Sequence, residues 1–277
     1  MLPTLRVHHF FGSRHQVAGR ALRVWLPALP ATSPARRLQV VYLLDGQNVF
    51  DGATAFAGIG WRANATTQRL VDRGSISPPI LVAIDNAGAH RLDEFTPDAW
   101  HGRGGQAAAF VHELLTAIVP FVDAHYPTRA EPAARALVGA SLGGLFALHV
   151  GLAHPEVFGA VAALSPSTWW ADGAVLRHVA HLPGRVPVRV WIDVGKRESP
   201  SHRRSVRTMA ELLASRGWQK HRVAKKASLR HVEVAGGRHD ERSWGDRFGR
   251  VLKFLLPPTR PPAPATRRAR AAASPGA

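Results

Sequence analysis

The chain has 277 residues and contains no cysteine. This absence excludes a disulfide framework, thiolate metal sites, iron–sulfur clusters and a cysteine nucleophile. The sequence also lacks an uninterrupted apolar run near the ~18 residues that a membrane-spanning helix needs. Its first residues lack the apolar core of a secretory signal peptide. We therefore expect no membrane span and a cytoplasmic location.

Acidic residues are scarce, because 19 Asp and Glu stand against 36 Lys and Arg, a formal net charge of +17. Residues 257–277 contribute six prolines, four arginines and no acid. Such a composition cannot bury apolar surface, so we expect a disordered tail after a single α/β domain over residues 1–256. The basic residues of that domain are scattered, which argues against a nucleic-acid partner. An anion-binding protein is the alternative that the charge leaves open.

Apolar runs alternate along the chain with segments of helical periodicity. The candidate strands are Val17–Leu26, Leu38–Leu44, Pro79–Ile84, Ala136–Gly139, Val157–Leu164, Val186–Val194 and Arg230–Val234. The candidate helices are Gly105–Ala124, Leu142–Leu152, Arg203–Ser215 and Trp244–Leu256. This order predicts an α/β fold with a mostly parallel central sheet, helices on both faces and antiparallel N-terminal strands. In such sheets, ligands bind beyond the carboxyl ends of the strands.

The segment Gly139–Gly143 has the pattern G-x-S-x-G between a candidate strand and a candidate helix. A sharp strand-to-helix turn of this kind exposes the serine hydroxyl at the sheet edge. The helix behind Ser141 offers free N–H groups at its N-terminus, so the amide of Leu142 could stabilise an oxyanion. We therefore expect Ser141 to be a nucleophile. A glycine-rich turn without chemistry is the alternative.

A nucleophilic serine needs a base and an acid, which in this architecture follow it in the order acid, then histidine. Among the eight histidines after Ser141, only His239 follows a candidate strand through a Gly-Gly turn. For the acid we favour Glu198, which lies beyond the carboxyl end of the strand that contains Asp193. Asp193 itself and Asp172 remain alternatives at this stage.

Several further segments resemble those of the Putative esterase family of α/β-hydrolases, which includes enterochelin and feruloyl esterases, S-formylglutathione hydrolases and mycolyltransferases. The matching segments are Val41–Asp51, Asp85–Pro97, Gly139–Gly144, Ser165–Gly173, Gly195–Glu198 and Gly236–Phe248. The resemblance implies the α/β-hydrolase fold, with Ser141 as nucleophile, Glu198 as acid and His239 as base. It also implies that the backbone N–H of Gln47 is a second oxyanion donor, opposite Leu142.

The same resemblance points to substrate-binding residues. Trp169 and Trp170 are expected to form an apolar wall, and Asn86 is expected at the same edge of the sheet. Arg91 is expected to pair with Asp93 or Glu94, with substrate binding as the alternative.

Two more expectations concern the surroundings of the site. We expect Trp244 to pack behind His239. The insert Gly52–Arg69 is rich in Gly and Ala and is either a mobile lid or a plain surface excursion.

These features together predict a serine esterase that hydrolyses carboxylic or thio esters of small molecules through an acyl-enzyme. The sequence offers no H-x-x-x-H pair and no cysteine ligand, so we expect neither a metal nor a cofactor. An acyltransferase with the same residues and a non-catalytic binding module on an esterase scaffold are the alternatives. No sequence feature distinguishes one ester from another.

Overall fold

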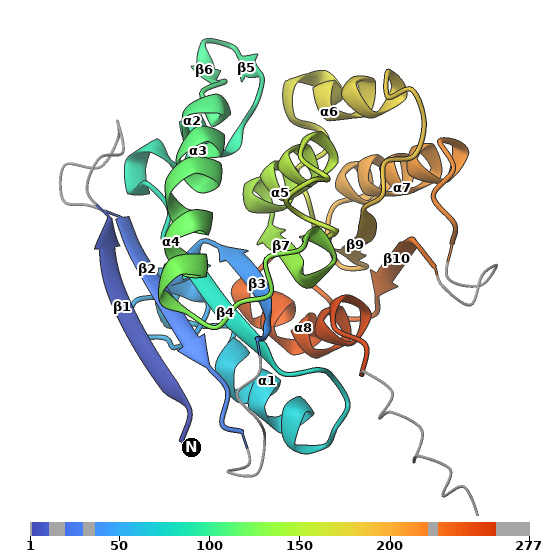
Figure 1. Ribbon diagram of the computed structural model, residues 1–277. Coiled ribbons are helices and arrows are strands. Elements are labelled where there is room, and N and C mark those ends of the chain that lie inside the picture. Colours follow the sequence, from blue (N-terminus) through green and yellow to red (C-terminus); the bar gives the residue numbers. More distant parts are fainter. Residues whose placement is uncertain (1, 11–19, 30–36, 221–226, 259–277) are drawn as a thin grey trace, which may run out of the picture.

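The computed structural model describes residues 2–10, 20–29, 37–220 and 227–258 (Figure 1). The tail predicted over residues 257–277 lies outside this part of the chain, apart from Pro257 and Pro258. Residues 17–19 of the first predicted strand also lie outside it.

An eight-stranded sheet forms the centre of the fold (Figure 1). Its strands lie in the order β1 (Thr4–Phe10), β2 (Arg20–Leu26), β4 (Pro79–Ile84), β3 (Gln39–Leu44), β7 (Arg135–Ala140), β8 (Ala160–Leu164), β9 (Arg189–Gly195) and β10 (Leu229–Val234). From β4 to β10 all neighbours pair in parallel, whereas β2 pairs antiparallel with both β1 and β4. The predicted α/β fold with a mostly parallel sheet and antiparallel N-terminal strands is confirmed.

Helices cover both faces of this sheet (Figure 1). One face carries α1 (Ala63–Asp72) and α8 (Glu241–Leu255), whose apolar side chains form one core cluster with the sheet. The other face carries α3 (Ala107–Glu113), a π-helical turn (Leu114–Ile118), α4 (Val119–His125), α5 (Leu142–Ala153), α6 (Trp170–Ala180) and α7 (Pro200–Ser215). Because both faces are covered, every residue of β4 and β7 is buried, which explains their continuous apolar runs.

Shorter elements lie in the connections. They are α2 (Arg91–Phe95), the small hairpin of β5 (Ala99–Trp100) and β6 (Arg103–Gly104), and 3₁₀ turns at Gly46–Asn48, Phe56–Gly58, Gly88–His90 and Pro132–Ala134. The hairpin is attached to the rest of the fold through the indole of Trp170, which donates to the carbonyl of Asp98 at 2.7 Å.

Among the described residues, one continuous helical segment, Ala107–His125, is long and apolar enough by length and composition to cross a membrane. In the structure, one face of this segment packs into the core of the sheet through Phe110, Leu114, Ile118 and Val122. The packing of this face in the core therefore accounts for the apolar side chains on it.

Several elements depart from the sequence prediction. No residue range was predicted for strand β1, because Leu5 and Val7 remain about half exposed and the strand is held by backbone pairing with β2. Helix α6 was not predicted either, since its first turn holds three successive residues of positive φ before regular helix begins. In the insert Gly52–Arg69, the residues from Ala63 onward form α1, which packs against α8, so this part is neither a lid nor a surface excursion.

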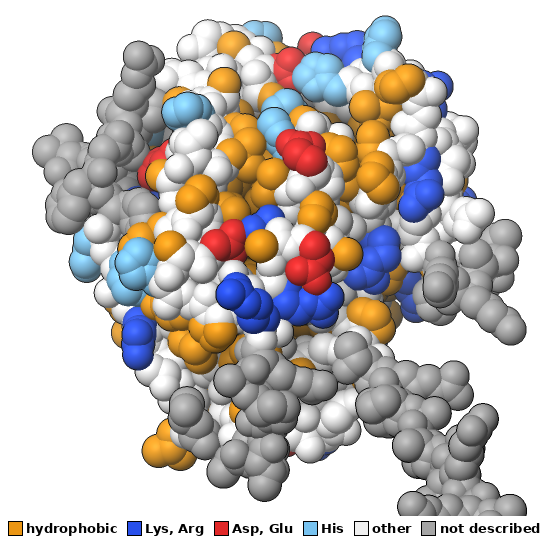
Figure 2. Space-filling model, in the orientation of Figure 1, with side chains coloured by type: hydrophobic (Ala, Val, Ile, Leu, Met, Phe, Trp, Pro, Cys, Tyr) orange, Lys and Arg blue, Asp and Glu red, His pale blue; other side chains and the backbone are white. Residues whose placement is uncertain are grey.

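The surface charge is dispersed on the face that Figure 2 displays. There, Lys and Arg side chains are scattered among Asp, Glu, His and hydrophobic side chains, and several acidic side chains lie directly beside basic ones. The excess of positive charge is thus not gathered into a single patch on this face.

We predict that Phe146→Ala, in the middle of α5, lowers the free energy of unfolding by about 3–5 kcal/mol. The ring of Phe146 is fully buried and lies 5.5 Å from that of Phe95 and 5.0 Å from that of Phe110, between centroids. Urea denaturation measures the loss. Phe56→Ala is the matched control, because Phe56 is 77% exposed and its removal should change stability by less than about 0.5 kcal/mol. Similar losses for the two variants would contradict this description of the core.

Candidate active site

Ser141 occupies a strained turn at the carboxyl end of β7. Its backbone angles are φ 57° and ψ −120°, outside the regions that residues other than glycine favour. Helix α5 begins at the next residue. A side chain on Gly139 would overlap the backbone of Gly143, so the turn requires glycine there. The sequence therefore folds locally into a turn that projects the hydroxyl of Ser141 from the sheet edge.

The structure brings Ser141, His239 and Glu198 together in one hydrogen-bonded row. His239 Nε2 lies 2.9 Å from Ser141 Oγ, and His239 Nδ1 lies 2.8 Å from Glu198 Oε2. The serine follows β7, the glutamate follows β9 and the histidine follows β10. All three thus come from loops at the carboxyl ends of parallel strands, although they are up to 98 residues apart.

A close approach of two backbones positions the glutamate and histidine loops. Gly195 ends β9 and lies directly against Gly237, so a side chain on Gly195 would overlap the carbonyl of Gly237. Arg197 N–H donates to that same carbonyl at 3.0 Å. The two loops are therefore tied together at their bases, which fixes the distance between Glu198 and His239.

Glu198 is ionised in a buried position because several donors surround it. Its Oε1 accepts from Ser165 Oγ and from the backbone N–H of Gly195, both at 2.6 Å. Burial alone would raise the pKa of this carboxyl, but the hydrogen bonds from His239, Ser165 and Gly195 outweigh it and lower the pKa to about 2.

A second row of buried polar groups supports the glutamate. Ser165 Oγ accepts from Arg247 Nη2 at 2.6 Å and from Trp244 Nε1 at 3.2 Å, so its own proton points to Glu198. Arg247 forms an ion pair of 2.8 Å with Asp193, which also accepts from the indole of Trp191. The contact between Ser165 and Arg247 could not be predicted from the sequence, since nothing in the local pattern links residues 82 positions apart.

The two alternative acids lie elsewhere. Asp193 is fully buried and faces α8, as its position within a strand suggested, and its partners are Arg247 and Trp191. Asp172 lies in the first turn of α6, and the structure describes no hydrogen bond or ion pair between its carboxylate and His239. Of the three candidates, Glu198 is the one in contact with His239.

A second histidine, His202, adjoins the same carboxylate and was not singled out by the sequence. Its Nε2 lies 2.9 Å from the carbonyl of Pro166, and its Nδ1 lies 3.2 Å from Glu198 Oε2. Burial lowers the pKa of His202, while the Pro166 carbonyl and Glu198 act in the opposite direction. Its spacing of four residues from Glu198, at the start of α7, is the signal that could have found it.

Glu198, His202 and His239 also form a group of possible metal ligands, with one donor atom from each within 4.8 Å of the others. The carboxylate oxygens of Glu198 already accept hydrogen bonds from Ser165, Gly195 and His239. A cation bound among these groups would have to displace the contact between Glu198 and His239.

The loop that holds Gln47 lies between the ends of β3 and β4. Gly46 packs so tightly on the backbone of Ile84 that no side chain fits there. Asp45, at φ 56°, accepts two hydrogen bonds from Arg91 at 2.6 and 2.7 Å and one from Asn86 Nδ2 at 2.6 Å. These contacts fix the path of the backbone around Gln47.

The expected partner of Arg91 is wrong. Arg91 pairs with Asp45, not with Asp93 or Glu94, because the loops after two neighbouring parallel strands meet here. Glu94 instead pairs with the buried Arg20 of β2 at 2.7 Å. The amide of Asn86 is engaged with Asp45 and with the N–H of Gly88, so its contacts order the loop.

Glu241, two residues after His239, joins α8 to the same loop. Its carboxylate accepts from Trp61 Nε1 at 2.6 Å and from Asn48 Nδ2 at 2.9 Å. Burial raises the pKa of Glu241 to about 7, against the hydrogen bond from Trp61, and the charge of Asp45 adds to the rise. The segments that carry Gln47 and His239 are thereby connected.

The aromatic residues near the serine separate into exposed and buried ones. Trp169 is 43% exposed, with its ring 6.0 Å from that of Trp100, whereas Trp170 is buried and holds the β5–β6 hairpin. Trp244 packs edge-on against His239 at 5.0 Å between ring centroids, which confirms its expected position. The rings of Trp169 and Trp170 lie 6.2 Å apart between centroids, and of the two only Trp169 is exposed.

Comparison with known proteins gives relatives along most of the chain. The family described as Putative esterase matches residues 19–255. The chain is 25% identical to the uncharacterized protein YbbA of Bacillus subtilis (strain 168), over 88% of this chain and 95% of that one. It is 30% identical to the iron(III) enterobactin esterase of Escherichia coli (strain K12), over 81% of this chain and 51% of the relative. The chain thus spans about half the length of that esterase.

Solved structures share the fold. The BES protein from Bacillus cereus superposes with a TM-score of 0.70 and 20% identity, over 92% of this chain and 95% of that one. The enterobactin esterase FES from Shigella flexneri, solved in the presence of enterobactin, superposes with a TM-score of 0.70 and 24% identity, over 91% of this chain and 58% of that one. With the family match over residues 19–255, these likenesses establish that the chain belongs to the Putative esterase family of ester-hydrolysing enzymes with the α/β-hydrolase fold.

Proposed function

We propose that this chain is a serine esterase that hydrolyses small-molecule carboxylic or thio esters with Ser141 as nucleophile, His239 as base and Glu198 as acid. The observation that carries the proposal is the unbroken row of hydrogen bonds from Ser141 through His239 to Glu198. Family membership supplies the reaction class, and the row of hydrogen bonds supplies groups of the right chemistry at the right distances.

The row assigns a direction to the proton transfer. Because Glu198 is ionised, it accepts from His239 Nδ1, which leaves the lone pair of Nε2 facing the hydroxyl of Ser141. Ser141 attacks the acyl carbonyl as His239 takes its proton, and the imidazolium then protonates the leaving alcohol or thiol. Glu198 stabilises the imidazolium charge throughout.

The negative charge of the tetrahedral intermediate needs donors on the opposite side. We propose the backbone N–H groups of Leu142, at the start of α5, and of Gln47. Among the described residues neither group donates to another backbone carbonyl, and the positive end of the α5 dipole adds to the stabilisation. The contacts of Asp45 and Glu241 keep the Gln47 loop in place.

Hydrolysis is favoured over transfer to another alcohol by the exposure of the base. The side chain of His239 is 38% exposed, so water can reach the acyl-enzyme and lose a proton to Nε2. An acyltransferase with the same residues would have to exclude that water. Trp169, exposed beside the serine loop, is a candidate contact for the substrate.

Replacement of the nucleophile provides the first test of this proposal. Ser141→Ala should lower the hydrolysis of p-nitrophenyl esters by about 10⁴–10⁶-fold, because covalent catalysis is lost. A fluorophosphonate probe should label Ser141 in the wild-type protein, as read by peptide mass spectrometry. Ser167→Ala is the matched control, since Ser167 Oγ lies 3.4 Å from Ser141 Oγ; that variant should still be labelled. Labelling at Ser165 or Ser167 would refute the assignment.

Replacement of the acid tests the charge on Glu198. Glu198→Gln should lower turnover by about 10²–10⁴-fold, because the imidazolium loses its counter-charge. Asp172→Asn, the same loss of charge in the first turn of α6, should cost less than about tenfold. If Asp172→Asn is the more damaging change, the acid has been assigned wrongly.

The stability of Glu198→Gln as a function of pH shows whether the variant acts through the lost charge or through misfolding. The folded pKa of Glu198, about 2, lies below the ordinary value of 4.5. Its ionised form therefore stabilises the fold above pH 4.5, and this contribution is lost as the pH falls toward 2. The difference in unfolding free energy between wild type and Glu198→Gln should shrink over that interval.

Metal removal tests the role of the group formed by Glu198, His202 and His239. Activity on p-nitrophenyl esters should be unchanged after dialysis against excess EDTA, because the proposed role of Glu198 is to accept from His239. A loss of activity that zinc or calcium restores would contradict this mechanism.

A further inference from the structure

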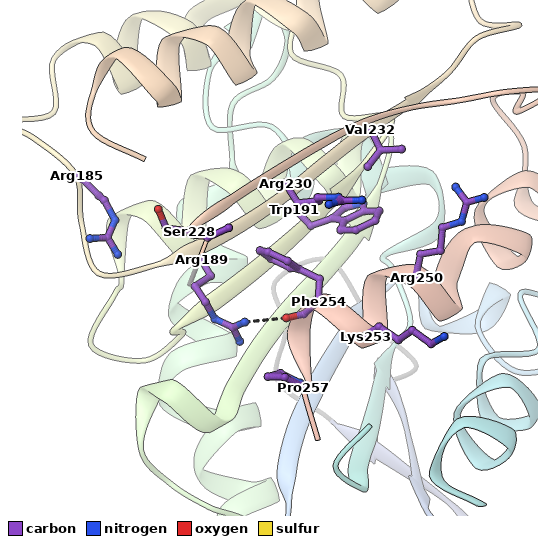
Figure 3. A pocket seen from close by; sticks show the side chains of 11 residues that line it. Arg185, Arg189, Trp191, Ser228, Arg230, Val232, Arg250, Lys253, Phe254 and Pro257 are labelled. Atoms are coloured by element: carbon purple, nitrogen blue, oxygen red, sulfur yellow. Dashed lines mark hydrogen bonds between the residues drawn. The ribbon is translucent and has the colours of Figure 1, made fainter. Parts of the chain in front are cut away.

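A second pocket, separate from the candidate active site, lies beside β9, β10 and α8 (Figure 3). Its volume is about 830 Å³, within the range of small-molecule sites. The lining residues are Arg185, Arg189, Trp191, Ala227, Ser228, Arg230, Val232, Arg250, Lys253, Phe254 and Pro257. Figure 3 shows Arg185 and Arg189 on one side, Arg250 and Lys253 on the other, and Trp191 and Phe254 between them.

The pocket is strongly and uniformly positive. Five of its lining residues are basic and none is acidic. Arg189 donates to the carbonyls of Phe254 and Leu255 at the end of α8, at 2.7 and 2.8 Å, and burial lowers its pKa. Within the described part of the chain, none of the five basic side chains forms an ion pair with a carboxylate. The charge of the four basic side chains other than Arg189 is thus left for a ligand to neutralise.

The base of the pocket is apolar. Val232 and Phe254 are half-buried, and the ring of Phe254 lies 5.9 Å from that of the buried Trp191. The indole N–H of Trp191 is engaged by Asp193, so Trp191 contributes no free polar group. A ligand here would meet hydrophobic surface between two sets of cations.

The strand directions place this pocket away from Ser141. Glu198 and His239 follow the carboxyl ends of β9 and β10, whereas Trp191 and Arg230 lie near the amino ends of these strands. Arg230 and Val232 are two residues apart and so share one face of β10. Glu233, on the opposite face, pairs with Arg207 of α7.

We infer that this pocket binds a small organic anion, in which a carboxylate is attached to an aromatic or aliphatic body. The guanidinium groups of Arg230 and Arg250 match the geometry of a carboxylate. The apolar body would occupy the surface formed by Val232 and Phe254. The concave apolar base distinguishes this site from a flat basic surface for a polyanion.

The test is a calorimetric titration of the full-length protein with 1-naphthoate. Before the titration, the candidate active site is blocked by a fluorophosphonate on Ser141. The double variant Arg230→Gln/Arg250→Gln should bind at least about tenfold more weakly than wild type, because two charge-assisted contacts are lost. Arg62→Gln/Arg73→Gln is the matched control: it removes the same charge at exposed positions outside the pocket and should bind within about twofold of wild type.

Additional ligands and a further variant complete the experiment. The neutral 1-naphthalenemethanol should bind at least about tenfold more weakly than 1-naphthoate. Lys253→Glu, a reversal of charge at an exposed position, should also weaken 1-naphthoate. The inference is overturned if 1-naphthoate fails to bind, if the pocket variants bind it like wild type, or if blocking Ser141 abolishes binding. It is also overturned if a short single-stranded DNA binds to the same arginines and 1-naphthoate does not.

Discussion

The buried carboxylate of Glu198 is the interaction on which the rest of the candidate site depends. An ionised group without partners in this position would be strongly destabilising, so the fold must supply donors around it. Ser165, the N–H of Gly195 and His239 do so, and they come from the carboxyl ends of β8, β9 and β10 or from the loops that follow. Meeting this requirement aligns the three loops, because each donor has to reach the same two oxygen atoms.

The support for this carboxylate extends through the sheet to its other side. Ser165 is held by Arg247 of α8, and Arg247 is neutralised by Asp193 of β9. Trp191 donates to Asp193 and also lines the basic pocket. Helix α8, which follows His239, therefore helps to position Glu198 through Arg247 and Ser165. The candidate active site and the second pocket thus share a continuous framework of buried polar contacts.

The positive charge of the chain has a more specific distribution than its sum of +17 suggests. Arg20, Arg91 and Arg247 are paired with carboxylates inside the fold. The basic residues around Phe254, by contrast, have no acidic partner in the described part of the chain. A high content of arginine thus serves two purposes: internal ion pairs that fix loops, and a local surface that can attract an anion.

The sequence by itself determined the alternation of strands and helices, the turn at Ser141 and the position of His239 after a strand, since each depends on a local pattern of apolar residues and glycines. It did not determine β1, which is held by pairing with β2, or the partner of Arg91, or the support that Ser165, Arg247 and His202 give to Glu198. These contacts join residues from different loops and helices. Only the tertiary structure decides them, because parallel strands bring their carboxyl ends to one edge regardless of the distance between them along the chain.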